Sequence, residues 1–169
     1  MHTNQDTLLT DPKLFSNTYI SELAWREFWQ HIAHHFPFAR YLEFQEKRRD
    51  LQWVNNPERF DHRKNGTTGY PIVDAGMRQL KATNRMHNRV RMIVASFLTK
   101  DLLIDRRRGE QHFADYLIDY DQNVNIGNRQ RAASVGADPK PLRIFSPIRQ
   151  SQRFDPQAEY ILKRCPELR

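Results

Sequence analysis

The most apolar stretch of the chain, residues 93–98, directly follows the heptapeptide Met-His-Asn-Arg-Val-Arg-Met at residues 86–92. A helix that begins in this heptapeptide would place Asn88, Arg91 and Met92 on one face, because residues three and four positions apart are neighbours on a helix. Polar groups beside a segment that forms the core must be hydrogen-bonded. Either the protein or a ligand therefore has to satisfy this amide and this guanidinium.

Apolar residues recur at helical spacing in much of the chain. In residues 17–35 they are Ile20, Leu23, Ala24, Phe28 and Ile32, and Pro37 ends the pattern. Further helices are predicted over residues 71–81, 86–104, 107–117 and 155–164, with Pro71 suited to a first helical position. Since no segment alternates as a strand does and no repeat is present, the predicted fold class is all-α.

The remaining segments are expected to be irregular. Residues 38–69 are rich in Arg, Asn, Asp and Gly, and are predicted to form a long loop with one or two short helical turns. Residues 119–131 are polar and turn-prone, which predicts a second loop, followed by a short helix over 130–135. Pro139, Pro141 and Pro147 should keep the next stretch irregular.

Chain length and cysteine content suggest a single domain in a reducing compartment. The 169 residues are enough for one domain with a hydrophobic core, expected over 19–169 after a polar lead-in at 1–18. The single cysteine, Cys165, excludes an internal disulfide framework and favours the cytoplasm. No apolar run approaches the roughly 20 residues of a membrane helix, and residues 1–11 lack the apolar core of a signal peptide.

The charge balance favours anionic partners without proving them. Lys and Arg outnumber Asp and Glu by 27 to 20, which gives a net charge of +7. Such a balance suits nucleic acid, a phosphorylated cofactor or an acidic surface, although many basic proteins bind nothing anionic. The clusters at 47–49 and 106–108 are more often solvated surface than ligand contacts. His31, His34 and His35 could present two imidazoles on adjacent turns, but no cysteine or well-placed carboxylate completes a metal site, and a solvated helix end explains them equally well.

Six segments, taken together, resemble one known family. They are Ser21–Phe28, Thr68–Arg78, Met86–Met92, Lys100–Asp105, Arg143–Pro147 and Pro166–Leu168. In order and spacing these segments resemble the flavin-binding helical domain of the DNA photolyase and cryptochrome family, nearest to the bacterial photolyases that repair cyclobutane pyrimidine dimers. The resemblance extends from about residue 19 to residue 169, and it implies an all-helical domain that holds FAD.

The resemblance assigns roles toward the cofactor residue by residue. Arg26 would meet the FAD phosphates, and Asn125 would lie opposite flavin N5. The residues that would line the flavin and its adenine are Asn88, Arg91, Asp119 and Asp121. Arg91 and Asp119 would form an ion pair against the flavin ring, where a guanidinium favours the anionic reduced form.

The resemblance also assigns residues to the DNA substrate. Photolyases flip the damaged pyrimidine pair out of the duplex, as enzymes that act on buried bases generally do. Glu22 would hydrogen-bond the flipped bases, Trp25 would stack on them and Met92 would pack beside them. Arg89 would contact a backbone phosphate next to the lesion. Glu22, Asn88, Asn125 and Trp53 are thus the candidate catalytic residues.

Arginine occupies four positions at which these photolyases normally carry tryptophan: Arg85, Arg106, Arg129 and Arg131. The family relays an electron to photo-excited flavin through three tryptophans. These map to Arg129 nearest the flavin, to Arg106, and to Trp53 at the outer end. Because a guanidinium is not oxidised at the potentials that suit an indole, light-driven flavin reduction by this route is expected to fail. Arg131 replaces the second aromatic wall of the lesion pocket, and can still stack on a base.

The same four arginines raise a question of stability. An unpaired buried charge costs several kcal/mol, so these positions are either exposed or a cause of instability. We expect exposure, because the chain lacks the family's N-terminal α/β antenna domain and the loop that grips the FAD pyrophosphate. Faces that pack on those parts would then meet water.

The sequence leaves three functions open. The first is the flavin-binding half of a light-driven repair lyase, impaired here, with weak or absent FAD binding and salt-sensitive binding of damaged DNA. The second is a cryptochrome-like photosensor, and the third is a non-catalytic helical domain that retains only the fold.

Overall fold

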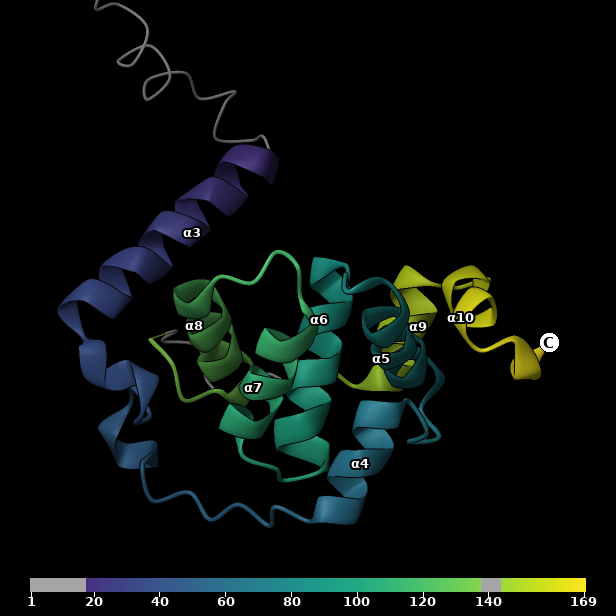
Figure 1. Ribbon diagram of the computed structural model, residues 1–169, viewed down its shortest axis with the longest axis horizontal. Helices are drawn as coiled ribbons and strands as arrows, with labels where there is room; N and C mark the ends of the chain where they lie inside the picture. The colour runs from purple at the N-terminus through teal and green to yellow at the C-terminus, as the bar shows by residue number, and fades with distance from the viewer. Residues whose placement is uncertain (1–17, 138–143) are drawn as a thin grey trace, which may run out of the picture.

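The computed structural model describes residues 18–137 and 144–169, and within these ranges every regular element is a helix (Figure 1). The α-helices are α3 (Thr18–His35), α4 (Pro57–Asn65), α5 (Pro71–Thr83), α6 (Asn88–Ser96), α7 (Arg106–Tyr116), α8 (Gln122–Ala133), α9 (Pro147–Phe154) and α10 (Glu159–Arg164). Three 3-10 turns, η1 (Pro37–Arg40), η2 (Glu46–Arg48) and η4 (Pro166–Leu168), and a π-helical turn, η3 (Phe97–Asp101), complete the set. The predicted all-α class is confirmed. Most of the predicted lead-in at 1–18, together with Pro139, Pro141 and Arg143, lies outside the described residues.

The core forms where α5 and α6 pack together, with α10 against the outer side of α5. Its central side chains, among them Val73, Leu80, Ile93, Val94 and Phe113, are almost completely buried. The apolar stretch at 93–98 therefore becomes the centre of the domain, as its composition predicts.

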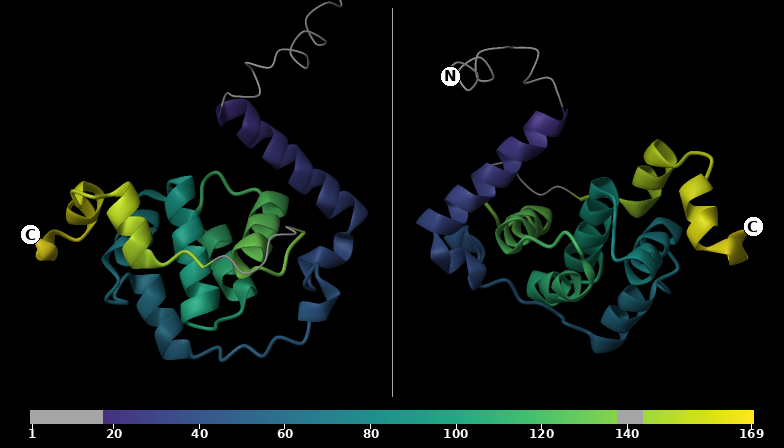
Figure 2. Two further views of the ribbon diagram at one scale, coloured as in Figure 1. Left: turned by 180° about the vertical axis from the view of Figure 1, so that it is seen from behind. Right: turned by 45° about the horizontal axis from the view of Figure 1, so that its top comes forward.

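Helix α3 lies along one side of the molecule, and its N-terminal turns extend away from the body formed by α4 to α8 (Figures 1 and 2). Its main contacts are with α8 and η1. Trp29 is buried in the α3–α8 contact, and a Cβ at Gly127 would lie 2.2 Å from the Trp29 ring. Only glycine allows this approach of the two helices.

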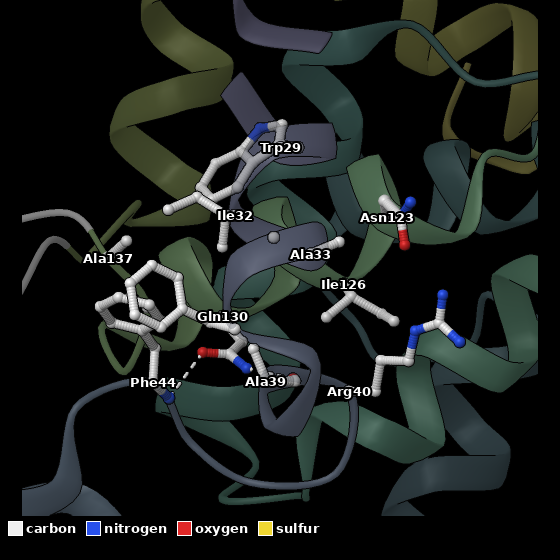
Figure 3. Close-up of a pocket in the computed structure, with 13 residues that line it drawn as sticks. Trp29, Ile32, Ala33, Ala39, Arg40, Phe44, Asn123, Ile126, Gln130 and Ala137 are labelled. Atoms are coloured by element: carbon white, nitrogen blue, oxygen red, sulfur yellow. Dashed lines mark hydrogen bonds between the residues drawn. The ribbon is translucent and has the colours of Figure 1, made fainter. Parts of the chain in front are cut away.

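The junction of α3, η1 and α8 is closely packed (Figure 3). It encloses a cavity of about 20 Å³ lined by Trp29, Ile32 and Ala33 of α3 and Ile126 of α8, which is room for one water molecule. The Phe44 amide donates to Gln130 Oε1 (2.9 Å) across this junction. The side chain of Gln130 thereby ties the segment after η1 to α8.

Three helices occupy segments that the sequence predicts as irregular. The stretch at Pro147 is one of them, and the prediction is wrong there: Pro147 stands in the first turn of α9, where proline is tolerated, and Ser146 caps the helix by accepting from Arg149 N–H (3.5 Å). Helix α4 lies inside the predicted loop at 38–69; the Asn56 side chain caps it by accepting from Arg59 N–H (2.9 Å), and Gly66 ends it at φ 65°. Helix α8 covers most of the predicted loop at 119–131, so the short helix predicted at 130–135 is wrong. Asp121 caps α8 by accepting from Val124 N–H (3.0 Å), a favourable N-cap.

Two predicted helices differ from the observed ones in their bounds. The helix predicted over 86–104 starts at Asn88 and turns into a π-helical segment at Phe97, so its predicted last residues are wrong. The helix predicted from Asp155 begins later, because Asp155 instead ends α9. The Asp155 carboxylate accepts from Tyr160 and Ile161 N–H (3.1 and 3.0 Å), which directs the start of α10.

Candidate functional site

A pocket of about 550 Å³ opens between α3, α6, α8 and the segment 117–121. Nearly all the residues assigned from the resemblance line it: Glu22, Trp25, Arg26, Asn88, Arg89, Arg91, Met92, Asp119, Asp121, Asn125 and Arg131. Trp53 is the exception; it is half-buried in the segment between η2 and α4. Residues from four parts of the sequence thus meet in one place.

The first turns of α6 form one wall of the pocket. His87 Nδ1 accepts from Arg89 N–H (3.2 Å) and caps the helix, so that Asn88, Arg91 and Met92 project into the pocket together. Arg91 donates from Nη2 to both Asp119 oxygens (3.0 and 2.8 Å) and from Nε to Met86 O (2.7 Å). The protein itself therefore satisfies this guanidinium, whereas the exposed Asn88 amide has no partner among the described residues.

Asp121 joins the pocket walls contributed by α3 and α8. Besides capping α8, its carboxylate accepts from Gln30 Nε2 (3.0 Å) and lies 3.9 Å from Arg26 Nε. Arg26 is mostly exposed and weakly paired, so its guanidinium can reach an anion at the mouth of the pocket. Asn125, one turn into α8, donates to Glu110 O (3.4 Å).

The indole of Trp25 lies between two flat partners. Its ring stacks on Trp29 (centroids 6.0 Å apart, interplanar angle 25°), and Arg131 Cζ lies 4.4 Å from a Trp25 ring centroid. Arg131 thus lies over an aromatic ring of the protein itself, and its stacking on a base stays a prediction. On the neighbouring wall, Arg89 Cζ lies 4.5 Å from the Phe154 ring of α9.

The expected exposure of the four arginines is correct for Arg85, and Arg131 is half-buried. It is wrong for Arg106, which is fully buried. Arg106 Nε lies 2.6 Å from Glu43 Oε2 and Nη1 lies 3.4 Å from Glu110 Oε2, while Nη2 donates to Leu42 O (3.2 Å). Carboxylates and a carbonyl take the place of water here, so this charge is compensated.

Arg129 is also buried, against the expectation, and it is less well compensated. Its Cζ lies 3.7 Å from the centroid of the Phe113 ring, and Nη1 has no hydrogen-bond partner within the described part of the chain. Burial holds the pKa of this guanidinium well below its ordinary value. Arg129 also lines the pocket.

Arg63 is another buried cation whose burial the sequence pattern does not predict. It is completely buried on α4, its three side-chain nitrogens lack partners among the described residues, and its Cζ lies 5.6 Å from the same Phe113 ring. Burial lowers the pKa of Arg63 to about 9. The spacing of Phe60 and Arg63 would have placed Arg63 on the buried side, but only if α4 had been predicted as a helix.

Other pocket residues were also not assigned from the sequence. They include Tyr120, Asn128 and Phe145. Burial is the main cause that raises the pKa of Tyr120. Among residues 18–137 and 144–169 no three His, Cys, Asp or Glu side chains gather as a metal site, and none of the helices there has the length and apolar character to cross a membrane.

Comparison with known proteins identifies the family. The family model described as the FAD binding domain of DNA photolyase matches residues 19–169. The chain is 53% identical over 148 residues to the deoxyribodipyrimidine photo-lyase of Synechococcus sp., covering 88% of this chain and 31% of that protein. It is 48% identical over 155 residues to the enzyme of that name from Escherichia coli, covering 90% and 33%.

Solved structures agree with this relationship. The bacterial class III photolyase from Agrobacterium tumefaciens superposes with a TM-score of 0.85 at 47% identity, covering 89% of this chain and 31% of that one. The cryptochrome of Synechocystis gives a TM-score of 0.86 at 38% identity, covering 94% and 32%. The chain spans about a third of the length of the curated relatives it matches. Over nearly its whole length, therefore, this chain belongs to the family of the FAD-binding domain of DNA photolyases.

Proposed function

We propose that this chain is the flavin-holding helical part of a light-driven lyase that splits cyclobutane pyrimidine dimers in DNA. The observation that carries the proposal is convergence: residues assigned separately to cofactor and substrate line one pocket of about 550 Å³. A pocket of this size lies within the range of small-molecule sites.

The polar groups of the pocket suit FAD. Arg26 offers an exposed guanidinium for the phosphates, and the unpartnered amide of Asn88 is free to hydrogen-bond a ring edge. Arg91, held by Asp119 at 2.8 Å, places a fixed positive charge where a reduced flavin would gain from it. These residues would hold the flavin, which when bound in its reduced form would supply light-driven electron transfer to and from the pyrimidine dimer.

The substrate side of the proposal rests on α3 and α6. Trp25 provides a stacking surface, Glu22 an acceptor and Met92 an apolar contact, all lining the same pocket. Arg89 at the start of α6 suits a backbone phosphate. With a net charge of +7, binding of DNA should weaken steeply with salt. A reducing, cytoplasmic location is part of the proposal, since Cys165 is a free buried thiol.

The relay positions separate the proposed functions. Arg129 and Arg106 leave Trp53 as the remaining tryptophan of the relay, so we expect no light-driven flavin reduction along it. A photosensor that depends on that step is thereby disfavoured, although a cryptochrome is among the structural relatives. A repair lyase supplied with reduced flavin does not need the relay, and a non-catalytic domain needs no flavin.

The first test is a titration of the purified chain with FAD, followed by flavin absorbance and fluorescence. The proposal expects a resolved, shifted visible band with quenched emission, at weak affinity. Asp119→Ala, which releases Arg91 from its partner, should weaken binding further, while Asp61→Ala on the exposed side of α4 serves as control. An unchanged flavin spectrum together with a cooperative helical melt would indicate a folded domain without flavin chemistry.

The second test is repair of an oligonucleotide that contains a thymine dimer, with chemically reduced flavin present, in light and in darkness. Light-dependent repair supports the lyase. A light-induced spectral change without repair supports the photosensor, and neither result with flavin bound supports the non-catalytic domain. Replacing Glu22 by Gln should reduce repair more than it reduces FAD binding.

A further inference from the structure

A second concave site lies away from the predicted flavin pocket. It is an open groove of about 500 Å³ between α4, α5 and α7, and no residue that lines it also lines the pocket. We call it the α4–α7 groove. Its lining includes three cationic and three aromatic side chains: Lys64, Lys81, Arg108, Phe60, His112 and Tyr116.

Two of the three cations of the α4–α7 groove lie against one ring. Arg108 Cζ lies 4.3 Å from the Phe60 ring centroid and Lys64 Nζ lies 5.2 Å from it. Arg108 Nη1 also donates to Asn55 O (3.1 Å), so this guanidinium is fixed in place. Lys81 on α5 is exposed and forms no ion pair within the described ranges.

Carboxylates compensate this charge only in part. Asp61 pairs with Lys64 (2.7 Å), and Asp115 accepts from Gln111 (2.8 Å). On α4, Arg63 and Lys64 lie three and four residues after Phe60, so each of them is a neighbour of Phe60 on the helix. The completely buried Arg63, whose three side-chain nitrogens have no partner in the part of the chain that the structure describes, adds positive charge beneath the groove.

The effect of Arg63 reaches the aromatic side of the groove. Burial first, then the charges of Arg63 and Lys64, lower the pKa of His112 to about 4. The imidazole is therefore neutral at pH 7 and offers a flat aromatic surface. Its ring centroid lies 4.8 Å from that of Tyr116 and 6.5 Å from that of Phe60.

We propose that the α4–α7 groove binds a nucleoside monophosphate, with Lys64, Lys81 and Arg108 around the phosphate and Tyr116 and His112 beside the base. A phosphate suits a site with excess positive charge fixed on a partly buried wall. Aromatic side chains of this kind stack on bases of any sequence. This site is independent of the proposed flavin pocket and does not require that FAD binds there.

The test is a calorimetric titration of the chain with adenosine 5′-monophosphate, alongside adenosine and inorganic phosphate alone. Lys81→Glu should weaken binding of the monophosphate about tenfold or more, as loss of a charged contact does. Lys47→Glu, an equally exposed lysine on η2, should leave it unchanged. The imidazole resonances of His112 should shift on saturation, and both partial ligands should bind more weakly than the monophosphate.

Two outcomes would overturn the proposal. One is the absence of binding to the unaltered chain at millimolar nucleotide. The other is binding that survives Lys81→Glu and is lost on Asp119→Ala, since the nucleotide would then occupy the flavin pocket. If phosphate alone binds as tightly as the nucleotide, the aromatic part of the proposal is wrong.

Discussion

Buried arginines occur in this chain in two electrostatic states. Arg106 is enclosed with Glu43 and Glu110, so its charge is matched by carboxylates. Arg63 is enclosed against the ring of Phe113 with three nitrogens unpartnered among the described residues. The two states predict opposite effects on stability when one charge is removed: a gain at Arg63 and a loss at the Arg106 pair.

Replacing Arg63 by Leu should stabilise the fold. The change removes a buried charge that has no counterion and fills a similar space with apolar atoms, which is worth about 1–4 kcal/mol in favourable cases. The free energy of unfolding in urea measures the effect. Arg59→Leu, an exposed arginine on the same helix, should change it by about 0.5 kcal/mol at most. A destabilised Arg63→Leu protein would mean that this guanidinium has an acceptor.

Replacing Glu43 by Gln should destabilise the fold by about 3–5 kcal/mol, because Arg106 would keep its buried charge and lose its nearest carboxylate. Thermal and urea unfolding both report this loss. Glu46→Gln is a suitable control, since Glu46 pairs with Arg49 at the surface and exposed pairs contribute little. Equal stability of the two variants would contradict the pairing described for Arg106.

At the scale of elements, the sequence pattern predicts those helices whose own residues favour a helix without contacts from distant parts of the chain. Helices α3, α5 and α7 follow from apolar spacing and from Pro71, and their bounds agree closely with the prediction. Helix α8 does not, because its polar sequence resembles a loop until Trp29 packs on Gly127 from a distant helix. Asp121 then serves at once as cap and as acceptor for Gln30, which only the tertiary fold reveals.

The candidate site, too, can be predicted from the sequence only in part. Its lining residues could be assigned from the resemblance, because the motifs place them at definite positions. The burial of Arg106 and Arg129 could not, since it depends on Glu43 and Phe113, which lie far from them in sequence or on another helix. Arg63 was missed because α4 was predicted as loop.

Replacing Gly127 by Ala should separate α3 from α8. The new Cβ would lie 2.2 Å from the Trp29 ring, and overpacking of this kind costs about 1–3 kcal/mol. Because α3 also carries Arg26, the proposed partner of the FAD phosphates, flavin affinity should fall together with stability. Gln122→Ala, an exposed change on the same helix, should affect neither unfolding nor flavin fluorescence. Unaltered unfolding of Gly127→Ala would show that the indole has room to move.

For the molecule as a whole, stability should fall in mild acid. The pKa of His112 is about 4 in the folded chain, against an ordinary value of 6.5. A neutral folded imidazole thus contributes stability above about pH 6.5, which is lost as pH falls toward 4, by about 1–3 kcal/mol. Urea unfolding at these two pH values measures the loss. His112→Phe should show a smaller loss, and an identical loss would assign the acid sensitivity to other groups.

Helix α3 carries Glu22, Trp25 and Arg26, and its main contacts with the rest of the described domain are those with α8 and η1. The pocket wall that α3 forms is therefore anchored mainly through these contacts. A ligand must use part of its binding free energy to immobilise this wall. Amide hydrogen exchange makes this visible, because ligand-induced protection should be greatest over residues 19–26 and slight in α5. Affinity for this pocket would then be set as much by how firmly Trp29 seats on Gly127 as by any group that touches the ligand.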